Sequence, residues 1–108
     1  MILLNKGLQT IGLAYKAGKL ITGEEQVLRM LKQNKLSLVL VANDASPKTI
    51  ERFKRKVYFY KTPINLDYTC DELSHSVGKP MIKILGLTDK EFFKALKRNF
   101  NGGAMNES

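Results

Sequence analysis

A run of five apolar residues near the middle of the chain constrains the fold more than any other feature. The run Leu38-Val39-Leu40-Val41-Ala42 has no polar position, so a strand formed by it would be apolar on both sides. Such strands are typical of sheets whose two faces are both covered by helices. The run is far too short to cross a bilayer, so it predicts a buried strand and not a membrane segment.

Helical patterns precede and follow this strand. Four apolar residues near the N-terminus recur with the spacing of one helical face: Leu4, Leu8, Ile11 and Tyr15. They predict a first helix from about Leu3 to Ala17, with Gly18 as its C-terminal stop. Gly7 and Gly12 inside this helix predict that it packs closely against a neighbouring element.

Helix starts recur along the rest of the chain. Three Thr-x-x-Glu segments have the spacing of a capping box, in which two side chains satisfy free amides: residues 22–25, 69–72 and 88–91. Ser46-Pro47 predicts a further start, with serine as N-cap and proline in the first turn. The helices that follow carry apolar stripes, which are Val27, Leu28 and Leu31, then Ile50, Phe53 and Val57, then Phe92, Phe93, Leu96 and Phe100.

Three further short strands are predicted between these helices: Lys19 to Thr22, Ile64 to Leu66 and Met81 to Leu87. Helices and strands then alternate along the whole chain, which predicts an α/β protein built as an α/β/α sandwich. We expect a single domain over residues 1–100, because no linker or repeat interrupts the pattern. Residues 101–108 contain Gly102-Gly103 and no apolar period, so we expect a disordered tail.

The charge of the chain favours a polyanionic partner. Lysine and arginine total 18 and aspartate and glutamate total 10, so the net charge is 18 − 10 = +8. This excess attracts RNA, DNA or an anionic membrane surface, although solubility alone also explains a basic composition. On the third predicted helix, four cations form either a second phosphate-tracking face or an ordinary solvated face: Lys48, Arg52, Arg55 and Lys56.

Cysteine and histidine usage gives no support for a metal centre or a catalytic site. Cys70 is the single cysteine and His75 the single histidine, so the chain has no intrachain disulfide and no Cys/His cluster with metal-ligand spacing. The sequence has no phosphate-binding glycine loop and no catalytic triad motif. It therefore predicts a cytoplasmic protein without signal peptide, cofactor or catalysis. An RNA-modifying fragment that lacks its catalytic domain is the enzymatic alternative.

Three predicted helix N-termini, at Gly23, Pro47 and Cys70, present free amides that can bind phosphate. Segments at residues 12–19 (Gly-Leu-Ala-Tyr-Lys-Ala-Gly-Lys), 22–25 (Thr-Gly-Glu-Glu) and 38–47 (Leu-Val-Leu-Val-Ala-Asn-Asp-Ala-Ser-Pro) resemble bacterial YlxQ-type proteins. These are relatives of the archaeal and eukaryotic ribosomal proteins that bind kink-turn RNA. The resemblance extends from about Leu4 to Phe100. It implies a four-stranded mixed sheet and RNA binding by the second helix and by the loop before the fourth helix.

The resemblance also implies individual site residues. In the wider family the second helix opens with Gly-x-Asn-Glu-x-x-Lys, which meets the RNA backbone and the guanines of sheared G·A pairs. Gly23 matches the glycine, and Glu25, Gln26 and Arg29 stand at the other three positions. Gln26 offers one acceptor where glutamate offers two, and Arg29 adds bidentate reach toward guanine O6 and N7. Glu25 also has a capping interpretation, and Lys19 and Thr22 flank the site.

A second family segment, Leu-Gly-x-x-x-Gly, is matched by Leu73 and Gly78, with serine in place of its first glycine. The resemblance implies that the loop before it, Tyr68, Thr69 and Cys70, contacts RNA. Tyr68 either stacks on an extruded base or packs at the end of a strand.

Charge and resemblance together predict a non-catalytic protein that binds ribosomal or another structured RNA as a monomer. The alternative is an adaptor that docks on the translation machinery through protein contacts, because Glu24 and Glu25 repel phosphate. Release from cell-lysate complexes by nuclease treatment distinguishes the two hypotheses.

Overall fold

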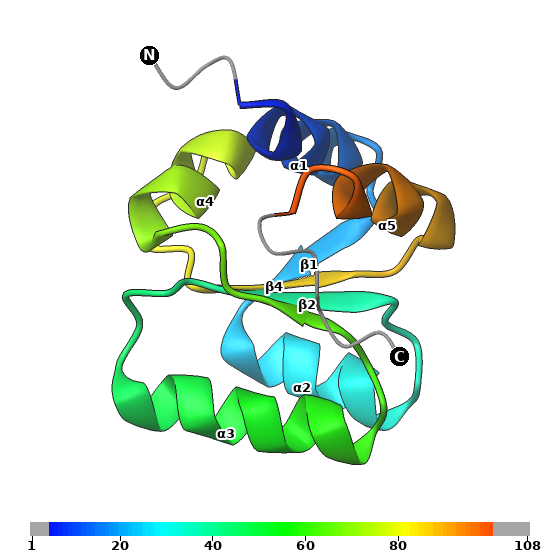
Figure 1. The fold of residues 1–108 in the computed structure, drawn as a ribbon, viewed down its shortest axis with the longest axis vertical. Coiled ribbons are helices and arrows are strands. Elements are labelled where there is room, and N and C mark those ends of the chain that lie inside the picture. The colour runs from blue at the N-terminus through cyan, green and yellow to red at the C-terminus, as the bar shows by residue number, and fades with distance from the viewer. Residues whose placement is uncertain (1–4, 101–108) are drawn as a thin grey trace.

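The computed structural model describes residues 5–100, which form three layers (Figure 1). The helices are α1 (Lys6–Lys16), α2 (Glu24–Lys32), α3 (Pro47–Phe59), α4 (Cys70–Val77) and α5 (Lys90–Lys97). The strands are β1 (Leu20–Thr22), β2 (Leu38–Val41), β3 (Ile64–Asn65) and β4 (Ile84–Leu87). Helices α1, α4 and α5 cover one face of the sheet, and α2 and α3 cover the other. This arrangement confirms the predicted α/β/α sandwich.

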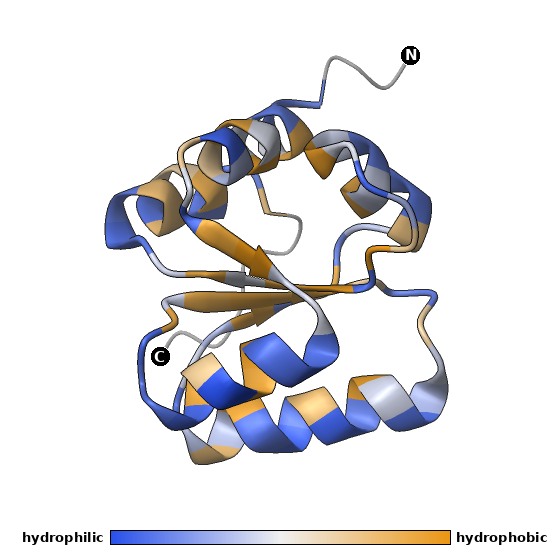
Figure 2. Ribbon diagram, turned by 180° about the vertical axis from the view of Figure 1, so that it is seen from behind, coloured by the Kyte–Doolittle hydropathy of each residue, from blue (hydrophilic) through white to orange (hydrophobic). Residues whose placement is uncertain are grey.

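The sheet is mixed and has the strand order β1-β4-β2-β3. Strand β4 runs antiparallel to β1 and β2, and β3 pairs in parallel with β2. Every residue of the two central strands is buried, and Figure 2 shows their apolar character between the two helical layers. The apolar run that begins at Leu38 is thus covered on both faces, as its composition predicts.

One edge of the sheet gathers loops that are far apart in the sequence. Strands β1, β2 and β3 end there, whereas β4 begins there. The Gly23 amide donates to the Ile84 carbonyl at 3.2 Å, and the Asn43 amide donates to the Tyr68 carbonyl at 2.9 Å. We call this side the Gly23 edge, and it comprises residue 23 and residues 42–46, 66–69 and 78–83.

Two glycines bring α1 close to α4, as their positions in the helix predict. A Cβ on Gly7 would overlap with Tyr68 Oη, and a Cβ on Gly12 would lie 2.9 Å from the Ser76 carbonyl oxygen. Neither site accepts a larger residue unless its neighbour shifts. The missing side chains therefore set the distance between α1 and the α4 region.

Several predicted boundaries differ from the structure. Helix α1 begins at Lys6, and its N-cap Asn5 accepts a hydrogen bond from the Leu8 amide at 2.9 Å. The start of the predicted helix at residues 3 and 4 and the predicted tail at 101–108 lie outside the described residues. Strand β4 begins at Ile84 and not at Met81, because Met81 has a φ of 55°, which is incompatible with a strand.

Two of the three predicted capping boxes are wrong by one residue. The N-cap of α2 is Gly23, because Thr22 is the last residue of β1. The N-cap of α5 is Asp89, and the Thr88 hydroxyl instead donates to the Lys19 carbonyl at 3.1 Å. Thr22 is thus engaged in strand pairing with Leu85, and Thr88 is engaged by the Lys19 carbonyl just before β1, so each helix begins one residue later than its local pattern predicts.

Candidate nucleic-acid interface

The N-terminus of α2 is the part of the Gly23 edge best suited to an anion. Gly23 has φ 97° and ψ 140°, a conformation that residues with a Cβ rarely adopt, and it provides no side-chain cap. A Cβ at this position would meet nothing within 4 Å, so the space in front of the helix is open. The first-turn amides of α2 can therefore approach a ligand backbone closely.

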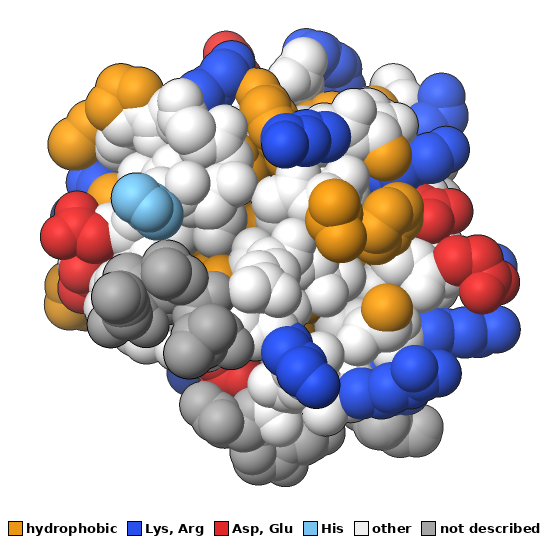
Figure 3. Space-filling view, turned by 90° about the horizontal axis from the view of Figure 1, so that it is seen from above, with side chains coloured by type: hydrophobic (Ala, Val, Ile, Leu, Met, Phe, Trp, Pro, Cys, Tyr) orange, Lys and Arg blue, Asp and Glu red, His pale blue; other side chains and the backbone are white. Residues whose placement is uncertain are grey.

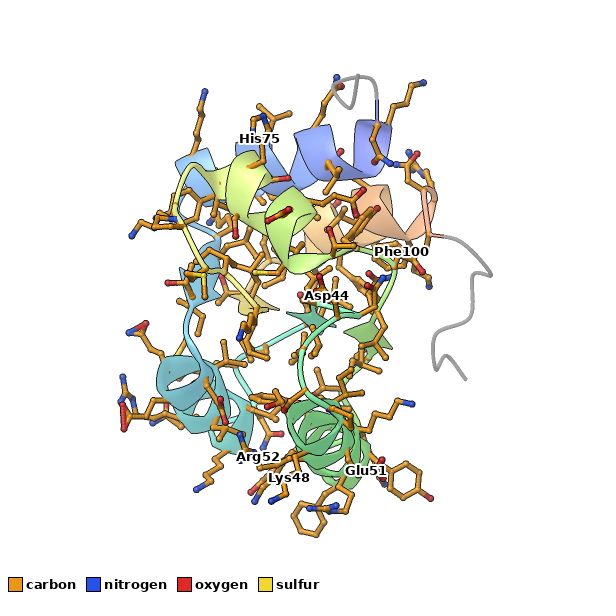
Figure 4. The ribbon with its side chains drawn as sticks, turned by 90° about the vertical axis from the view of Figure 1, so that its left-hand side faces the viewer. Asp44, Lys48, Glu51, Arg52, His75 and Phe100 are labelled. Carbon is orange, nitrogen blue, oxygen red and sulfur yellow. The ribbon has the colours of Figure 1, made fainter. Side chains whose placement is uncertain are left out.

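The other two helix N-termini predicted to bind phosphate are capped by side chains. The Thr69 amide donates to Glu72 Oε1 at 2.9 Å, which completes the predicted capping box of α4. The Cys70 amide donates to Asp44 Oδ1 at 2.9 Å, and Figure 4 shows Asp44 between α4 and the helices below. Two carboxylates therefore occupy this terminus and would repel a phosphate. At α3 the predicted N-cap is confirmed, with the Ser46 hydroxyl as its cap.

Three predicted site residues share the solvent face of α2. Glu25, Gln26 and Arg29 are all exposed, and their spacings of three and four residues place them on neighbouring positions of the helix surface. Thr22 is half-buried in β1, opposite Leu85. The structure thus brings together the residues at the α2 N-terminus that the resemblance implies.

An ion pair links the start of α2 to α3. The Glu24 carboxylate contacts the Arg52 guanidinium, and both side chains are about two-fifths exposed. Figure 4 shows Arg52 on the side of α3 that faces α2. Arg52 is therefore engaged by a carboxylate. It does not belong to a free phosphate-tracking face, although one interpretation of the sequence placed it there. Its charge neutralises the acidic residue that directly follows Gly23.

The segment between α4 and β4, residues 78–83, also belongs to the Gly23 edge, although the sequence predicts a strand from Met81 onward. A hydrogen bond from the Ile82 amide to Ser74 Oγ at 2.8 Å fixes this segment to α4. Lys79, Met81 and Lys83 are exposed, and Met81 is 72% exposed despite its apolar side chain. Lys83 directly precedes Ile84, whose carbonyl accepts from the Gly23 amide, whereas the Lys79 ammonium lies over the Tyr15 ring of α1, 5.8 Å from its centroid.

Residues 5–97 match the profile described as the Ribosomal protein L7Ae/L30e/S12e/Gadd45 family. The chain belongs to this family. The match includes α2 and the whole Gly23 edge, so the candidate interface lies within the region that the family shares.

Curated relatives confirm the resemblance to YlxQ-type proteins. The chain is 39% identical over 97 residues to the RNA-binding protein YlxQ of Enterococcus faecium, covering 90% of this chain and 93% of that protein. It is 31% identical over 86 residues to the RNA-binding protein YlxQ of Bacillus subtilis (strain 168), covering 80% and 86%.

Solved structures confirm the fold. A protein of unknown function from Bacillus halodurans has a TM-score of 0.83 at 30% identity and covers 87% of this chain and 95% of that chain. The Giardia lamblia 15.5kD RNA binding protein has a TM-score of 0.73 at 12% identity and covers 85% and 82%. The second likeness concerns the fold alone.

Lys19 and Tyr68 are not placed beside Gly23 as free side chains. Lys19 precedes β1 and lies at the other end of the strand, about 13 Å along it from Gly23 at about 3.3 Å per residue. The Tyr68 side chain is 5% exposed and belongs to the core, where its hydroxyl lies against Gly7. The sequence left two roles open for Tyr68, base stacking and packing, and the structure supports packing.

The pKa of Tyr68 is raised above its ordinary value of 10.0, first because burial disfavours the phenolate and then because the carboxylates of Asp67 and Glu72 repel it. The folded protein therefore holds this proton at pH values where the unfolded chain has released it. Linkage predicts that the free energy of unfolding falls as the pH rises above about 10.

The Tyr68→Phe variant is expected to lose this part of the alkaline destabilisation. The measurement is urea unfolding of both proteins from about pH 9 to about pH 11, the range in which tyrosine titrates. The wild type should lose stability more steeply than the variant above about pH 10. Parallel curves would show that Tyr68 titrates alike in the folded and unfolded chains.

Within residues 5–100, no helix is long and apolar enough to cross a membrane. Across the same residues, no group of three or more histidine, cysteine, aspartate or glutamate side chains could hold a metal ion.

Proposed function

We propose that this protein binds structured RNA of the kink-turn type, without catalysis, through the N-terminus of α2 and the exposed segment before β4. The observation that carries the proposal is the uncapped α2 N-terminus at Gly23, which has open space in front of it. Its relatives in two bacteria are named as RNA-binding proteins. The net charge of +8 favours the same class of ligand.

The roles of the side chains follow from their positions. The amides after Gly23 bind the phosphate backbone, and Lys79 and Lys83 hold neighbouring phosphates. Arg29 and Gln26 then lie on the exposed face of α2, where they address base edges. Thr69, Cys70 and Tyr68 are not part of the proposed contact, because their amides or ring are already engaged within the protein.

Glu25 does not reach back to Thr22 in a capping box, so its carboxylate remains on the exposed face of α2. It can accept hydrogen bonds from amino groups of bases, although it repels phosphate. The adaptor hypothesis relied on this repulsion and on that of Glu24. The ion pair with Arg52 neutralises the Glu24 carboxylate, so Glu24 no longer supports the adaptor hypothesis.

The test is fluorescence anisotropy of a labelled kink-turn RNA against a plain duplex of equal length, repeated over a salt series. We expect tighter binding to the kink-turn, and we expect the preference to survive at higher salt because base contacts depend little on released counterions. Equal and steeply salt-dependent binding to both RNAs would contradict the proposal and indicate a general basic surface. Absence of binding to either would direct the search to protein partners.

Arg52→Ala is expected to weaken kink-turn binding about threefold at low salt. The variant leaves the Glu24 carboxylate unpaired beside the phosphate site, and one charge about 6 Å away costs about 0.7 kcal/mol in water. Salt should reduce the effect, since the ion pair is partly exposed.

Two controls separate this local effect from the loss of net charge. Lys16→Ala removes one exposed charge on α1 and should change affinity little. The double variant Glu24→Gln with Arg52→Ala removes both partners and should restore wild-type affinity. A double variant that binds as weakly as Arg52→Ala would show that Arg52 contacts RNA itself.

A further inference from the structure

The C-terminal half of α3 exposes two adjacent aromatic rings. Tyr58 is 85% exposed and Phe59 is 71% exposed, and both are among the large apolar side chains that the described chain leaves in solvent. Aromatic rings bury about 150–250 Å² when they pack, so a pair left in water forgoes a large stabilisation. Exposed apolar patches of this kind mark binding surfaces.

Each ring is accompanied by a free cation one turn earlier. Lys54 precedes Tyr58 by four residues and Arg55 precedes Phe59 by four, so each pair lies on one strip of the helix surface. Both cations are exposed, as is Lys61 just after the helix. The outer face of α3 thus alternates rings with positive charges.

Acidic side chains hardly offset these charges on α3. The helix contains five cations and one acidic residue, Glu51, and within the described residues only Arg52 among those cations forms an ion pair. Figure 4 shows Glu51 and Lys48 on the outer side of α3. On the opposite layer of the molecule, Figure 3 shows lysine and arginine interspersed with aspartate and glutamate. The excess of positive charge around the two rings is therefore specific to α3 and is not a feature of the whole surface.

The Phe59 ring is held in place although it is exposed. It contacts the half-buried Tyr60 edge to face, with ring centroids 4.9 Å apart and an interplanar angle of 86°. A ring that is already oriented loses less conformational freedom when a ligand stacks on it. Phe59 thus provides an oriented stacking face next to the exposed Tyr58 ring.

This surface lies far from the Gly23 edge. Helix α3 starts at that edge and has 13 residues, so its last turn is about 18 Å away at about 1.5 Å per residue. The rings therefore cannot belong to the α2 interface and need a separate ligand segment.

We propose that the outer face of α3 binds a single-stranded segment of RNA, with bases stacked on Tyr58 and Phe59 and phosphates held by Lys54, Arg55 and Lys61. Stacking platforms that alternate with cations are the usual way in which proteins hold unpaired nucleic acid. A protein partner accounts for the two rings and Arg55, which protein interfaces favour, but not for Lys54 and Lys61, because lysine is depleted in the buried part of such interfaces. The choice of RNA over DNA rests on the proposed function. The assignment of this surface to single-stranded nucleic acid rests only on the exposed rings and cations of α3.

The test is anisotropy of a labelled oligoadenylate of about twelve nucleotides, as RNA and as DNA, with an RNA duplex of equal length for comparison. The ring variant is Tyr58→Leu with Phe59→Leu, which keeps apolar surface but removes the stacking faces. The charge variant is Lys54→Ala with Arg55→Ala. Leu13→Ala, which truncates an apolar side chain that is 60% exposed on α1, is the matched control.

We expect the ring variant to bind the single strand at least about tenfold more weakly, with an unchanged slope of log affinity against log salt. The charge variant should lower that slope by about 1.4, from about 0.7 for each lost phosphate contact on a single strand. Leu13→Ala should bind like the wild type. Thermal unfolding of each variant should match the wild type, since all of these side chains are exposed.

Wild-type binding by the ring variant would overturn the proposal and leave the rings to a protein partner. So would a wild type that binds the duplex as well as it binds the single strand. Arg29→Ala should weaken kink-turn binding without affecting the oligonucleotide, so failure at α3 and failure at the α2 interface are distinguishable. Equal binding of the RNA and DNA oligonucleotides would support the surface and show that it does not select the sugar.

Discussion

Replacing Arg29, Lys79 and Lys83 together with alanine is expected to weaken kink-turn binding by about 100-fold at about 0.1 M salt. The three side chains are exposed, with Arg29 on α2 and with Lys79 and Lys83 on the segment that leads into β4, where the Ile84 carbonyl accepts from the Gly23 amide. Lys79 and Lys83 are the proposed phosphate contacts and each releases a counterion, so the triple variant should also lower the slope of log affinity against log salt by about 2. The measurement is the same anisotropy titration at several salt concentrations.

A charge-matched control decides whether position matters. Three exposed lysines serve for this control, one on α1, one just before β1 and one on α5: Lys16, Lys19 and Lys90. Their triple replacement by alanine gives the same net charge, 8 − 3 = +5. The geometry predicts that this control keeps most of the affinity, although the sequence alone, in which Lys19 lies near Gly23, placed Lys19 in the site. Equal losses in the two triple variants would mean that net charge, and not the Gly23 edge, carries the binding.

Local patterns predicted the layers of this fold well. The apolar run that begins at Leu38 is buried at every position of β2, and Ser46 caps α3 as its pairing with proline indicates. Both signals depend on residues that are neighbours in the chain, so the sequence contains the whole argument. The helix starts at Thr22 and Thr88 were misplaced, because Thr22 pairs with Leu85 of β4 and Thr88 donates to the Lys19 carbonyl, and the local pattern contains neither contact.

The candidate site was predicted only on its α2 side. Gly23, Gln26 and Arg29 come from one continuous segment, whose motif the sequence displays directly. The segment with Met81 and Lys83 was missed, because its place beside Gly23 depends on the antiparallel pairing of β1 with β4. The turn at Gly78 and Pro80 was a usable signal for its start, since this pair commonly ends a helix and interrupts a strand. The sequence could not decide whether the Tyr68 ring is buried, because its burial depends on contact with Gly7, which is far away in the sequence.

That glycine gives the second large effect: Gly7→Ala is expected to lower the free energy of unfolding by about 1–3 kcal/mol. The new Cβ would overlap with Tyr68 Oη, and the Tyr68 ring is 5% exposed, so it has little room to move away. Alanine otherwise stabilises a helix interior by about 1 kcal/mol relative to glycine, so a destabilisation would identify the contact as its cause. Urea unfolding of both proteins measures the difference.

A double-mutant cycle with Tyr68→Phe isolates that contact. Without the hydroxyl, the nearest ring atom to the new Cβ is Tyr68 Cζ at 3.2 Å, a tight contact that a small shift relieves. Gly7→Ala should therefore cost less in the Tyr68→Phe background, with a coupling of about 1–2 kcal/mol. Gly18→Ala, at a positive φ of 76° in open space, should cost the same in both backgrounds. Equal costs of Gly7→Ala in the two backgrounds would show that the ring is free to leave its pocket, and Tyr68 would then return as a candidate for base stacking.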